Sequence, residues 1–381
     1  MLSIFILSSC HDSLELPVAP ERRVVVVYMI AENSLSSYAQ NDLSEIRRAT
    51  SSIPDSCTLV VFIDDTHTEP GPRILTFDNR DGERVLFEYK EDPISTDSAT
   101  MQQALDFIIR QCPARHYGLV LWSHGSGWIP QRQQAARHTI GIDNGRNTTS
   151  NTGTELEIPT LANILANTGQ RWDYVFFDAC FMQGVEVAYE LREVADWVIG
   201  SPAESPGNGA PYDYIMKDMF ADAKDVWTIA RDYYEYYEES FSYYGAPVLS
   251  CVNTAQLDQL ADATATVLAG LDAYPLADIQ EYGAYGYSNY PSWFPRYFDM
   301  GSAMAHWLDD ETYRAWQEAL ERAVPYRYAA DRWVSAYPYS YQLPVTDPEH
   351  IACLSMYIPG EHKLQDNNFS RLKWHKVMGW H

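Results

Sequence analysis

The feature that most constrains the fold is a set of short, continuously apolar runs, each followed by polar residues. The runs are Val24–Ile30, Leu59–Ile63, Leu119–Trp122 and Tyr174–Phe177. Unbroken apolar runs of strand length are typical of strands that are buried on both faces, as in a parallel sheet. Segments with helical spacing of apolar residues lie between them, for example at 39–49 and 98–110. This alternation predicts βαβ units and an α/β fold with a mainly parallel central sheet.

Two of these runs end at residues that can carry out nucleophilic chemistry. Tyr174–Phe177 is followed by Asp178 and Cys180, and Leu119–Trp122 is followed by His124. In an open α/β sheet, the carboxyl ends of the strands meet at one edge, and ligands bind there. We therefore predict that Cys180 is a nucleophile and that His124 is its acid–base partner. A helical pattern that begins near residue 182 would favour the thiolate form of Cys180.

Each residue also has a structural interpretation. Most free cysteines are small buried side chains, and a single histidine at a strand end is more often a turn or core residue. The occurrence of both at strand ends favours catalysis. Gly125 and Gly127 follow His124 and remove side-chain bulk there. We predict that the N–H groups of Gly125 and Cys180 stabilise a developing oxyanion.

At these residues the chain resembles the clostripain family of cysteine peptidases, which share a caspase-like fold with gingipains, legumains and caspases. The similar segments are SHGSGW around His124, FFDACFM around Cys180, and the stretches 24–46 and 198–214. The resemblance is weaker in the last hundred residues. It implies a caspase-like three-layer α/β/α sandwich with a C-terminal extension, and a catalytic dyad of His124 and Cys180.

Substrate specificity is predicted from Asp178, which by the resemblance lines the primary specificity pocket. Asp178 lies two residues before Cys180 on the same side of the strand, and a buried unpaired carboxylate is costly. A substrate arginine or lysine would supply the partner, although an internal salt bridge is the alternative. Ala210 stands where the family has a bulkier aromatic residue. The resemblance also gives Ser201 and Glu204 substrate-binding roles.

The segment 129–154 is rich in Asn, Thr and Gly and is predicted to be a solvent-exposed loop. Relatives with this fold are activated by cleavage in such a linker, and the candidate sites here are Arg132, Arg137 and Arg146. The alternative is that these are ordinary exposed loop arginines.

The first ten residues, MLSIFILSSC, resemble the end of a bacterial lipoprotein signal, in which Cys10 would be lipidated. No basic region precedes the apolar run, and a frayed apolar N-terminus is the alternative. We expect a bacterial cell-envelope protein that is lipid-anchored, on the periplasmic face or the cell surface, or secreted. The expected organisation is a leader and tether at 1–20, a peptidase core at 21–255, and a C-terminal part at 256–381 packed on the core.

Composition limits the partners. The formal net charge of −25 argues against nucleic acid, because phosphate binding needs a basic surface, and it would steer basic peptides toward the protein. We expect a monomer with no required cofactor and no metal site. Calcium, which some relatives use, stays open, since acidic pairs such as Asp64 and Asp65 are too generic to assign. Disulfides and buried thiols are both open for Cys57, Cys112, Cys251 and Cys353.

These features together predict a cysteine endopeptidase that cleaves after arginine or lysine. A transpeptidase or ligase on the same fold would use the same residues and exclude water. A non-catalytic binding lipoprotein is a third class, but its expected mark, the loss of His124 or Cys180, is absent.

Overall fold

The computed structural model describes residues 21–128, 140–145, 153–240, 246–282, 297–334, 342–360 and 367–380. The predicted leader and tether at 1–20, including Cys10, lie outside these residues. Arg132, Arg137 and Arg146 lie outside them as well. Within the described chain, no helix has both the length and the apolar character that crossing a bilayer requires.

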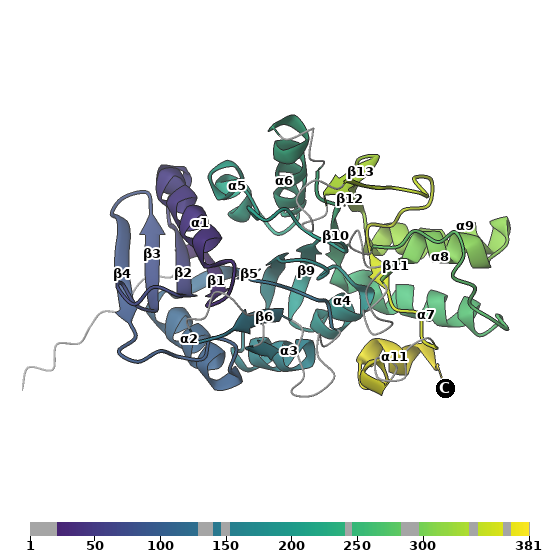
Figure 1. Ribbon diagram of the computed structural model, residues 1–381, viewed down its shortest axis with the longest axis horizontal. Helices are drawn as coiled ribbons and strands as arrows, with labels where there is room; N and C mark the ends of the chain where they lie inside the picture. The colour runs from purple at the N-terminus through teal and green to yellow at the C-terminus, as the bar shows by residue number, and fades with distance from the viewer. Residues whose placement is uncertain are drawn as a thin grey trace, which may run out of the picture.

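One sheet of nine strands, in the order β12-β10-β9-β8-β5-β1-β2-β3-β4, forms the centre of the molecule (Figure 1). Its five middle strands are parallel: β9 (Ala195–Gly200), β8 (Trp172–Asp178), β5 (Ala114–Trp122), β1 (Glu21–Ala31) and β2 (Cys57–Asp65). Antiparallel strands extend both edges: β10 (Leu249–Asn253) and β12 (Tyr326–Tyr328), and β3 (Arg73–Asp78) and β4 (Gly82–Glu88). The predicted mainly parallel sheet is confirmed.

Helices cover both faces of this sheet. One face carries α1 (Ser36–Ala49), α5 (Tyr212–Met219) and α6 (Trp227–Ser240), which lie above the sheet in Figure 1. The other carries α2 (Ser98–Gln111), α3 (Ile158–Asn167), α4 (Val185–Leu191), α7 (Leu257–Leu268), α8 (Met300–Trp307), α9 (Asp310–Ala323) and α11 (Lys373–Met378). This is the predicted three-layer, caspase-like arrangement.

The apolar run of β1 follows from this layering. Val24 and Val26 pack into the core on the α2 and α3 side, whereas Val25 and Val27 pack into the core under α1. All four side chains are fully buried. Burying a valine contributes about 1.5–3 kcal/mol, so the side chains on both faces of the strand stabilise the fold. Because both faces are buried, the strand is continuously apolar.

The linker between the two predicted catalytic strands differs from the prediction. Residues Ile140–Asp143 form β6, which pairs with β7 (Thr154–Leu156) and is not an exposed loop. Ile140 and Ile142 are buried, and Ile140 forms a β-bridge with Gly125. The polar composition of the whole segment concealed these two apolar positions.

Near the C-terminus, Asp309 accepts hydrogen bonds from the N–H groups of Glu311 and Thr312 and thereby caps the start of α9, shortly after α8 ends at Trp307. The late strand β15 (Ser355–Met356) pairs with β11 (Phe298–Asp299). A further small hairpin joins β13 (Arg332–Val334) to β14 (Gln342–Pro344).

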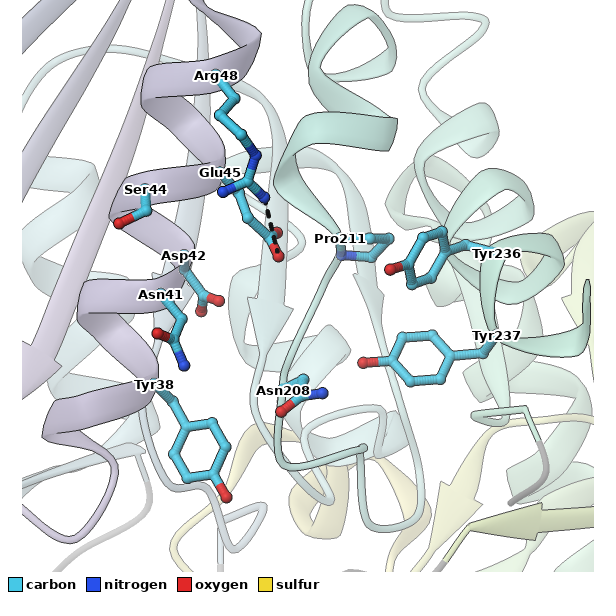
Figure 2. Close-up of a pocket in the computed structure, with 10 residues that line it drawn as sticks. All are labelled: Tyr38, Asn41, Asp42, Ser44, Glu45, Arg48, Asn208, Pro211, Tyr236 and Tyr237. Carbon is cyan, nitrogen blue, oxygen red and sulfur yellow. Dashed lines mark ion pairs between the residues drawn. The ribbon is translucent and has the colours of Figure 1, made fainter. Parts of the chain in front are cut away.

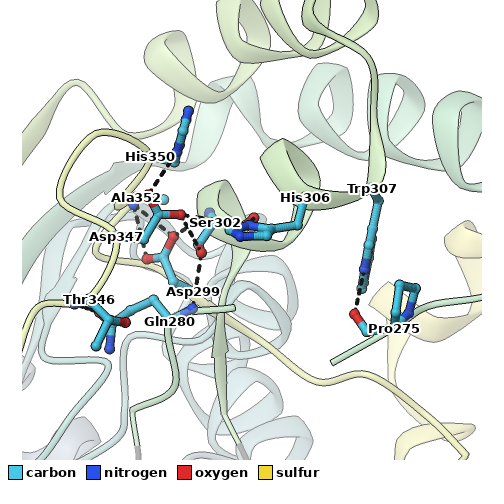
Figure 3. Close-up of polar contacts among 10 residues, drawn as sticks. All are labelled: Pro275, Gln280, Asp299, Ser302, His306, Trp307, Thr346, Asp347, His350 and Ala352. Carbon is cyan, nitrogen blue, oxygen red and sulfur yellow. Dashed lines mark hydrogen bonds and ion pairs between the residues drawn. The ribbon is translucent and has the colours of Figure 1, made fainter. Parts of the chain in front are cut away.

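The C-terminal part packs directly against the loops at the carboxyl edge of the sheet. The ring of Tyr297 stacks on Phe181 at 5.7 Å between centroids, and the Ser355 N–H donates to the Gln183 carbonyl at 3.0 Å. Buried polar contacts hold this part together around Asp299, which accepts from the N–H groups of Ser302 and Ala352 (Figure 3). The extension therefore supports the segment that follows Cys180.

Candidate active site

His124 and Cys180 emerge from neighbouring strands at equivalent positions. In the parallel register of β5 and β8, Trp122 pairs with Asp178, so each candidate lies two residues beyond the last paired position. Adjacent strands are about 4.8 Å apart. The two segments touch, because a Cβ atom added to Gly125 would lie 2.5 Å from the carbonyl oxygen of Cys180. The structure thus brings together the two residues predicted from separate strand ends.

Gly125 is required by this close approach. A side chain at position 125 would also lie 2.9 Å from the sulfur of Met182, in addition to its clash with the Cys180 carbonyl. Substitution would push the two strand ends apart. The oxyanion roles of the Gly125 and Cys180 N–H groups remain predictions.

The Cys180 thiol is partly buried, and its Sγ accepts a hydrogen bond from the Ser205 N–H at 3.3 Å. Burial, with a contribution from the Glu204 carboxylate, raises the pKa of Cys180 to about 12. The expectation of a thiolate stabilised by a nearby helix start is therefore wrong for the free protein. Helix α4 begins only at Val185, and the Glu204 and Asp178 carboxylates disfavour a thiolate at Cys180.

The His124 imidazole is held by the loop that follows β1. The imidazole Nε2 lies 2.8 Å from Oγ of Ser34. The backbone carbonyl of His124 accepts from the Gly141 N–H at 3.0 Å. The neighbouring Asn33 is buried and donates to the Ile142 carbonyl at 2.8 Å. The protein atoms packed around the ring lower the pKa of His124 to about 4. Near neutral pH, the resting site therefore pairs a neutral imidazole with a neutral thiol.

Asp178 lies buried beneath the segment 209–212. Both of its oxygens accept from the Ala210 N–H at 3.1 Å, and the Tyr212 hydroxyl donates to one of them at 3.1 Å. Burial raises the pKa of Asp178 to about 6, although these donors counteract the rise. Gly209 passes so close that an added Cβ would lie 2.9 Å from the carboxylate. Among the described residues, the hydrogen-bond partners of Asp178 are the neutral donors Ala210 and Tyr212, in place of the salt bridge considered as an alternative.

A cavity of about 290 Å³ lies next to this carboxylate, between α1, the segment 208–211 and α6 (Figure 2). Its lining includes Tyr38, Asp42, Glu45, Asn208 and Tyr237. Asp42 accepts from the Trp122 indole N–H at 2.7 Å, and burial together with Asp178 raises its pKa to about 9. Burial, with Asp213, raises the pKa of Glu45 to about 7.

Sequence reasoning did not identify Asp42 and Glu45. Their only signal is that two carboxylates stand three residues apart on one helix, a pattern that solvent-exposed helices share.

The other predicted binding residues lie on the loop after β9. Ser201 is fully buried, and its hydroxyl accepts from the Ala203 N–H at 3.1 Å within its own turn. Glu204 is buried beside Cys180. Their roles in substrate binding remain predictions.

The described cysteines outside the site are free thiols. No disulfide joins the described cysteines, and Cys57, Cys251 and Cys353 are buried. Cys112 is partly buried.

Comparisons with known proteins identify the family of the chain. The profile of the clostripain family, Peptidase_C11, matches residues 27–324. A secreted C11 cysteine protease from Bacteroides thetaiotaomicron, solved with an irreversible peptide inhibitor, is 28% identical with a TM-score of 0.79 over 94% of this chain and 99% of its own. An inactive zymogen C11 protease from Parabacteroides distasonis is 30% identical, with a TM-score of 0.77 over 95% of this chain and 99% of its own. No curated protein sequence matches.

The family match covers most of the chain and includes both strand ends with their histidine and cysteine. The chain belongs to the clostripain family of cysteine peptidases.

Proposed function

We propose that this peptidase is an endopeptidase in which Cys180 is the nucleophile and His124 the acid–base residue. The observation that carries the proposal is the contact between their two strand ends, which needs the glycine at position 125. The irreversible peptide inhibitor bound to the Bacteroides thetaiotaomicron relative supports covalent chemistry on a peptide.

The protonation states of His124 and Cys180 in the free protein define the order of proton transfer. Because His124 has a lowered pKa and Cys180 a raised one, the neutral imidazole accepts the thiol proton as Sγ forms a bond to the scissile carbonyl carbon. The imidazolium then returns that proton to the leaving amine as the C–N bond breaks. Water hydrolyses the thioester, and His124 again accepts and returns a proton. The N–H groups of Gly125 and Cys180 are the proposed donors to the tetrahedral oxyanion.

We further propose that the substrate residue before the cleaved bond is arginine or lysine. Support comes from the carboxyl groups of Asp178 and Asp42 beside the cavity, and from the high negative charge of the chain. Glu45 lines the same cavity, but it lies 3.8 Å from the guanidinium of Arg48, another lining residue. A substrate guanidinium would gain charge-assisted hydrogen bonds chiefly from Asp178, because the raised pKa of Asp42 leaves that group protonated near neutral pH. We propose that Ser201 and Glu204 line the opposite wall of the substrate cleft.

Activation by cleavage is a separate proposal. The Parabacteroides distasonis relative was solved as an inactive zymogen, and candidate sites in this chain are Arg132, Arg137 and Arg146. Intact-mass measurement of the purified protein, with and without Cys180→Ala, tests it. Two fragments that form only with Cys180 present are expected, and an uncut but fully active protein would contradict it.

Cell-envelope localisation through lipidation of Cys10 is also proposed, from the apolar run that precedes it and from the secreted relative. Incorporation of labelled palmitate that is lost in Cys10→Ala is the expected result. The proposed state of the anchored or released peptidase is a monomer, which light scattering tests.

The central experiment compares Cys180→Ala with Cys112→Ala, a matched change at another partly buried cysteine. On a peptide substrate with a central arginine, we expect Cys180→Ala to retain less than about one percent of turnover and Cys112→Ala to retain most of it. Higher residual turnover in Cys180→Ala would refute the nucleophile. Mass analysis of the products separates hydrolysis from transfer to an amine.

A second variant tests the acid–base residue. His124→Ala should lower kcat/KM by roughly 10²–10⁴-fold, because both proton transfers lose their carrier. Ser34→Ala serves as its control, since it removes only the hydroxyl beside the imidazole and should cost far less.

A further inference from the structure

A tyrosine of the C-terminal part contacts both of the segments that carry the proposed catalytic residues. The hydroxyl of Tyr297 donates a hydrogen bond to the Ser126 carbonyl, two residues after His124. The ring of Tyr297 stacks on that of Phe181, the residue after Cys180, at 5.7 Å between centroids and an interplanar angle of 22°. Tyr297 is buried, and it directly precedes β11, outside the sheet that positions His124 and Cys180.

On the histidine side, the backbone is shaped to admit this tyrosine. Gly127 has a φ of +71°, a left-handed conformation that residues with a side chain rarely adopt. A Cβ atom added to Gly127 would press against the Tyr297 hydroxyl and lie 2.9 Å from the ring carbon Cζ. The contact between Tyr297 and the Ser126 carbonyl therefore needs the glycine at position 127.

On the cysteine side, Phe181 has a φ of +60°, which is costly for a residue with a bulky side chain. Such a backbone conformation persists only where its surroundings hold it. The Phe181 N–H donates to the Ala203 carbonyl at 2.8 Å, and the Tyr297 ring packs on the phenyl ring. Because Phe181 directly follows Cys180, this conformation determines how the chain turns away from the nucleophile.

We propose that Tyr297 is a positioning residue for catalysis, which holds the His124 loop and the Cys180 loop in register with each other. This inference rests on the proposed function. Proton transfer between imidazole and thiol, and donation by the Gly125 N–H to the oxyanion, both depend on the relative placement of the two loops. A displacement of about 1 Å costs on the order of a hundredfold in rate. The C-terminal part then sets the geometry of a site whose reacting groups belong to the core.

Two variants of Tyr297 separate its two contacts. Tyr297→Phe removes the hydroxyl that reaches Ser126 and keeps the ring on Phe181, whereas Tyr297→Leu removes both contacts. On a peptide with a central arginine, Tyr297→Phe should lower kcat by roughly 10–100-fold and leave KM within about threefold of the parent value. Tyr297→Leu should lower kcat further. Titration with an irreversible peptide inhibitor gives kcat per competent molecule, so a loss of folded protein does not count as a loss of rate.

Tyr282→Phe is the matched control. Tyr282 is fully buried, its N–H donates to the Tyr297 carbonyl at 2.8 Å, and its hydroxyl donates to Asp299 at 2.7 Å within the C-terminal part. Since each variant loses one buried hydroxyl donor, the two should lower the unfolding temperature by similar amounts. Tyr282→Phe should nevertheless change kcat by less than about twofold.

A second measurement does not need peptidase activity. Alkylation of Cys180 by iodoacetamide at pH 7.5, followed by peptide mass analysis, relies on His124 to accept the thiol proton, and His124→Ala gives its lower limit. Tyr297→Phe should slow this alkylation by about threefold or more, and Tyr282→Phe should not.

The outcomes distinguish this inference from the proposed function. A parent protein that cleaves no peptide would contradict the endopeptidase, and the alkylation rates alone would then decide the role of Tyr297. The positioning role is overturned if Tyr297→Phe matches the parent in both kcat and alkylation rate, or if Tyr282→Phe loses as much of either.

Discussion

Asp64 and Asp178 lie at the carboxyl ends of two parallel strands of one sheet, and both are buried, yet their surroundings differ. Asp178 accepts from the Ala210 N–H and the Tyr212 hydroxyl, whereas Asp64 faces the carboxylates of Glu32 and Asp143 and shares the Ser95 hydroxyl with Asp143. Burial raises the pKa of Asp178 to about 6. Burial, with Glu32 and Asp143, raises that of Asp64 to about 9.

Asp299 provides a third case. It is fully buried and accepts from the N–H groups of Ser302 and Ala352 (Figure 3). It also accepts from the Tyr282 hydroxyl, and burial raises its pKa to about 6. The two aspartates with several donors thus behave alike, whereas the one that faces two carboxylates does not. The difference teaches that burial alone does not set the pKa of a buried aspartate, because the donors and the charges around it also count.

The largest expected effect is on substrate choice. Asp178→Asn should lower the preference for an arginine peptide over its citrulline analogue by a hundredfold or more, because two charge-assisted hydrogen bonds contribute about 1.5–3 kcal/mol each. Asp64→Asn should leave this ratio unchanged, since it lies at another strand end. The ratio of kcat/KM values for the two peptides measures the effect. An unchanged ratio in Asp178→Asn would make Asp178 structural and move the basic preference to Asp42 or Glu204.

Stability should separate the aspartates in sign. In Cys180→Ala protein, Asp64→Asn should raise the free energy of unfolding by about 1 kcal/mol, because it removes a buried acidic group that faces Glu32 and Asp143. Asp299→Asn should lower it by a similar amount, because its amide opposes N–H donors. Urea denaturation followed by circular dichroism measures both. Destabilisation by Asp64→Asn would show that its carboxylate already has a favourable partner.

The features that could be predicted from the sequence are those that depend on a single strand and the residues next to it. The run before Cys180 predicted β8, its nucleophile and the adjacent Asp178, since alternation and strand ends are local properties. The proximity of Glu32, Asp64 and Asp143 depends on tertiary structure, because Asp143 reaches Asp64 only once β6 is in place beside the sheet. The protonation state of Cys180 was mispredicted for the same reason, because burial by the surrounding segments, and secondarily Glu204 from another strand end, raises its pKa.

The pH dependence of substrate choice should follow Asp178. Its pKa of about 6 means that the carboxylate is charged above this pH and becomes neutral as pH falls through it. The preference for arginine over citrulline should therefore be full near pH 7.5 and fall up to roughly tenfold per pH unit below 6. Using the ratio cancels the ionisation of His124, which both substrates share. A ratio that stays constant from pH 7.5 to 5 would contradict ionised Asp178 as the recognition group.

The smallest expected effect concerns the midpoint of this pH dependence, the pH at which the preference for arginine has fallen by half. It tests whether the donors of Asp178 set this midpoint. Tyr212→Phe removes the hydroxyl that donates to the carboxylate at 3.1 Å and leaves the buried ring in place. A hydrogen bond to the charged form favours ionisation, so its loss should raise the pKa of Asp178 and move the midpoint upward by about half to one pH unit. Tyr237→Phe, which removes a donor to the Gly209 carbonyl in the same cavity wall, is the matched control and should leave the midpoint in place. If both variants shift the midpoint equally, the change comes from the segment 209–212 as a whole. If only Tyr212→Phe shifts it, the donors distinguish Asp178 from Asp64 as the comparison requires.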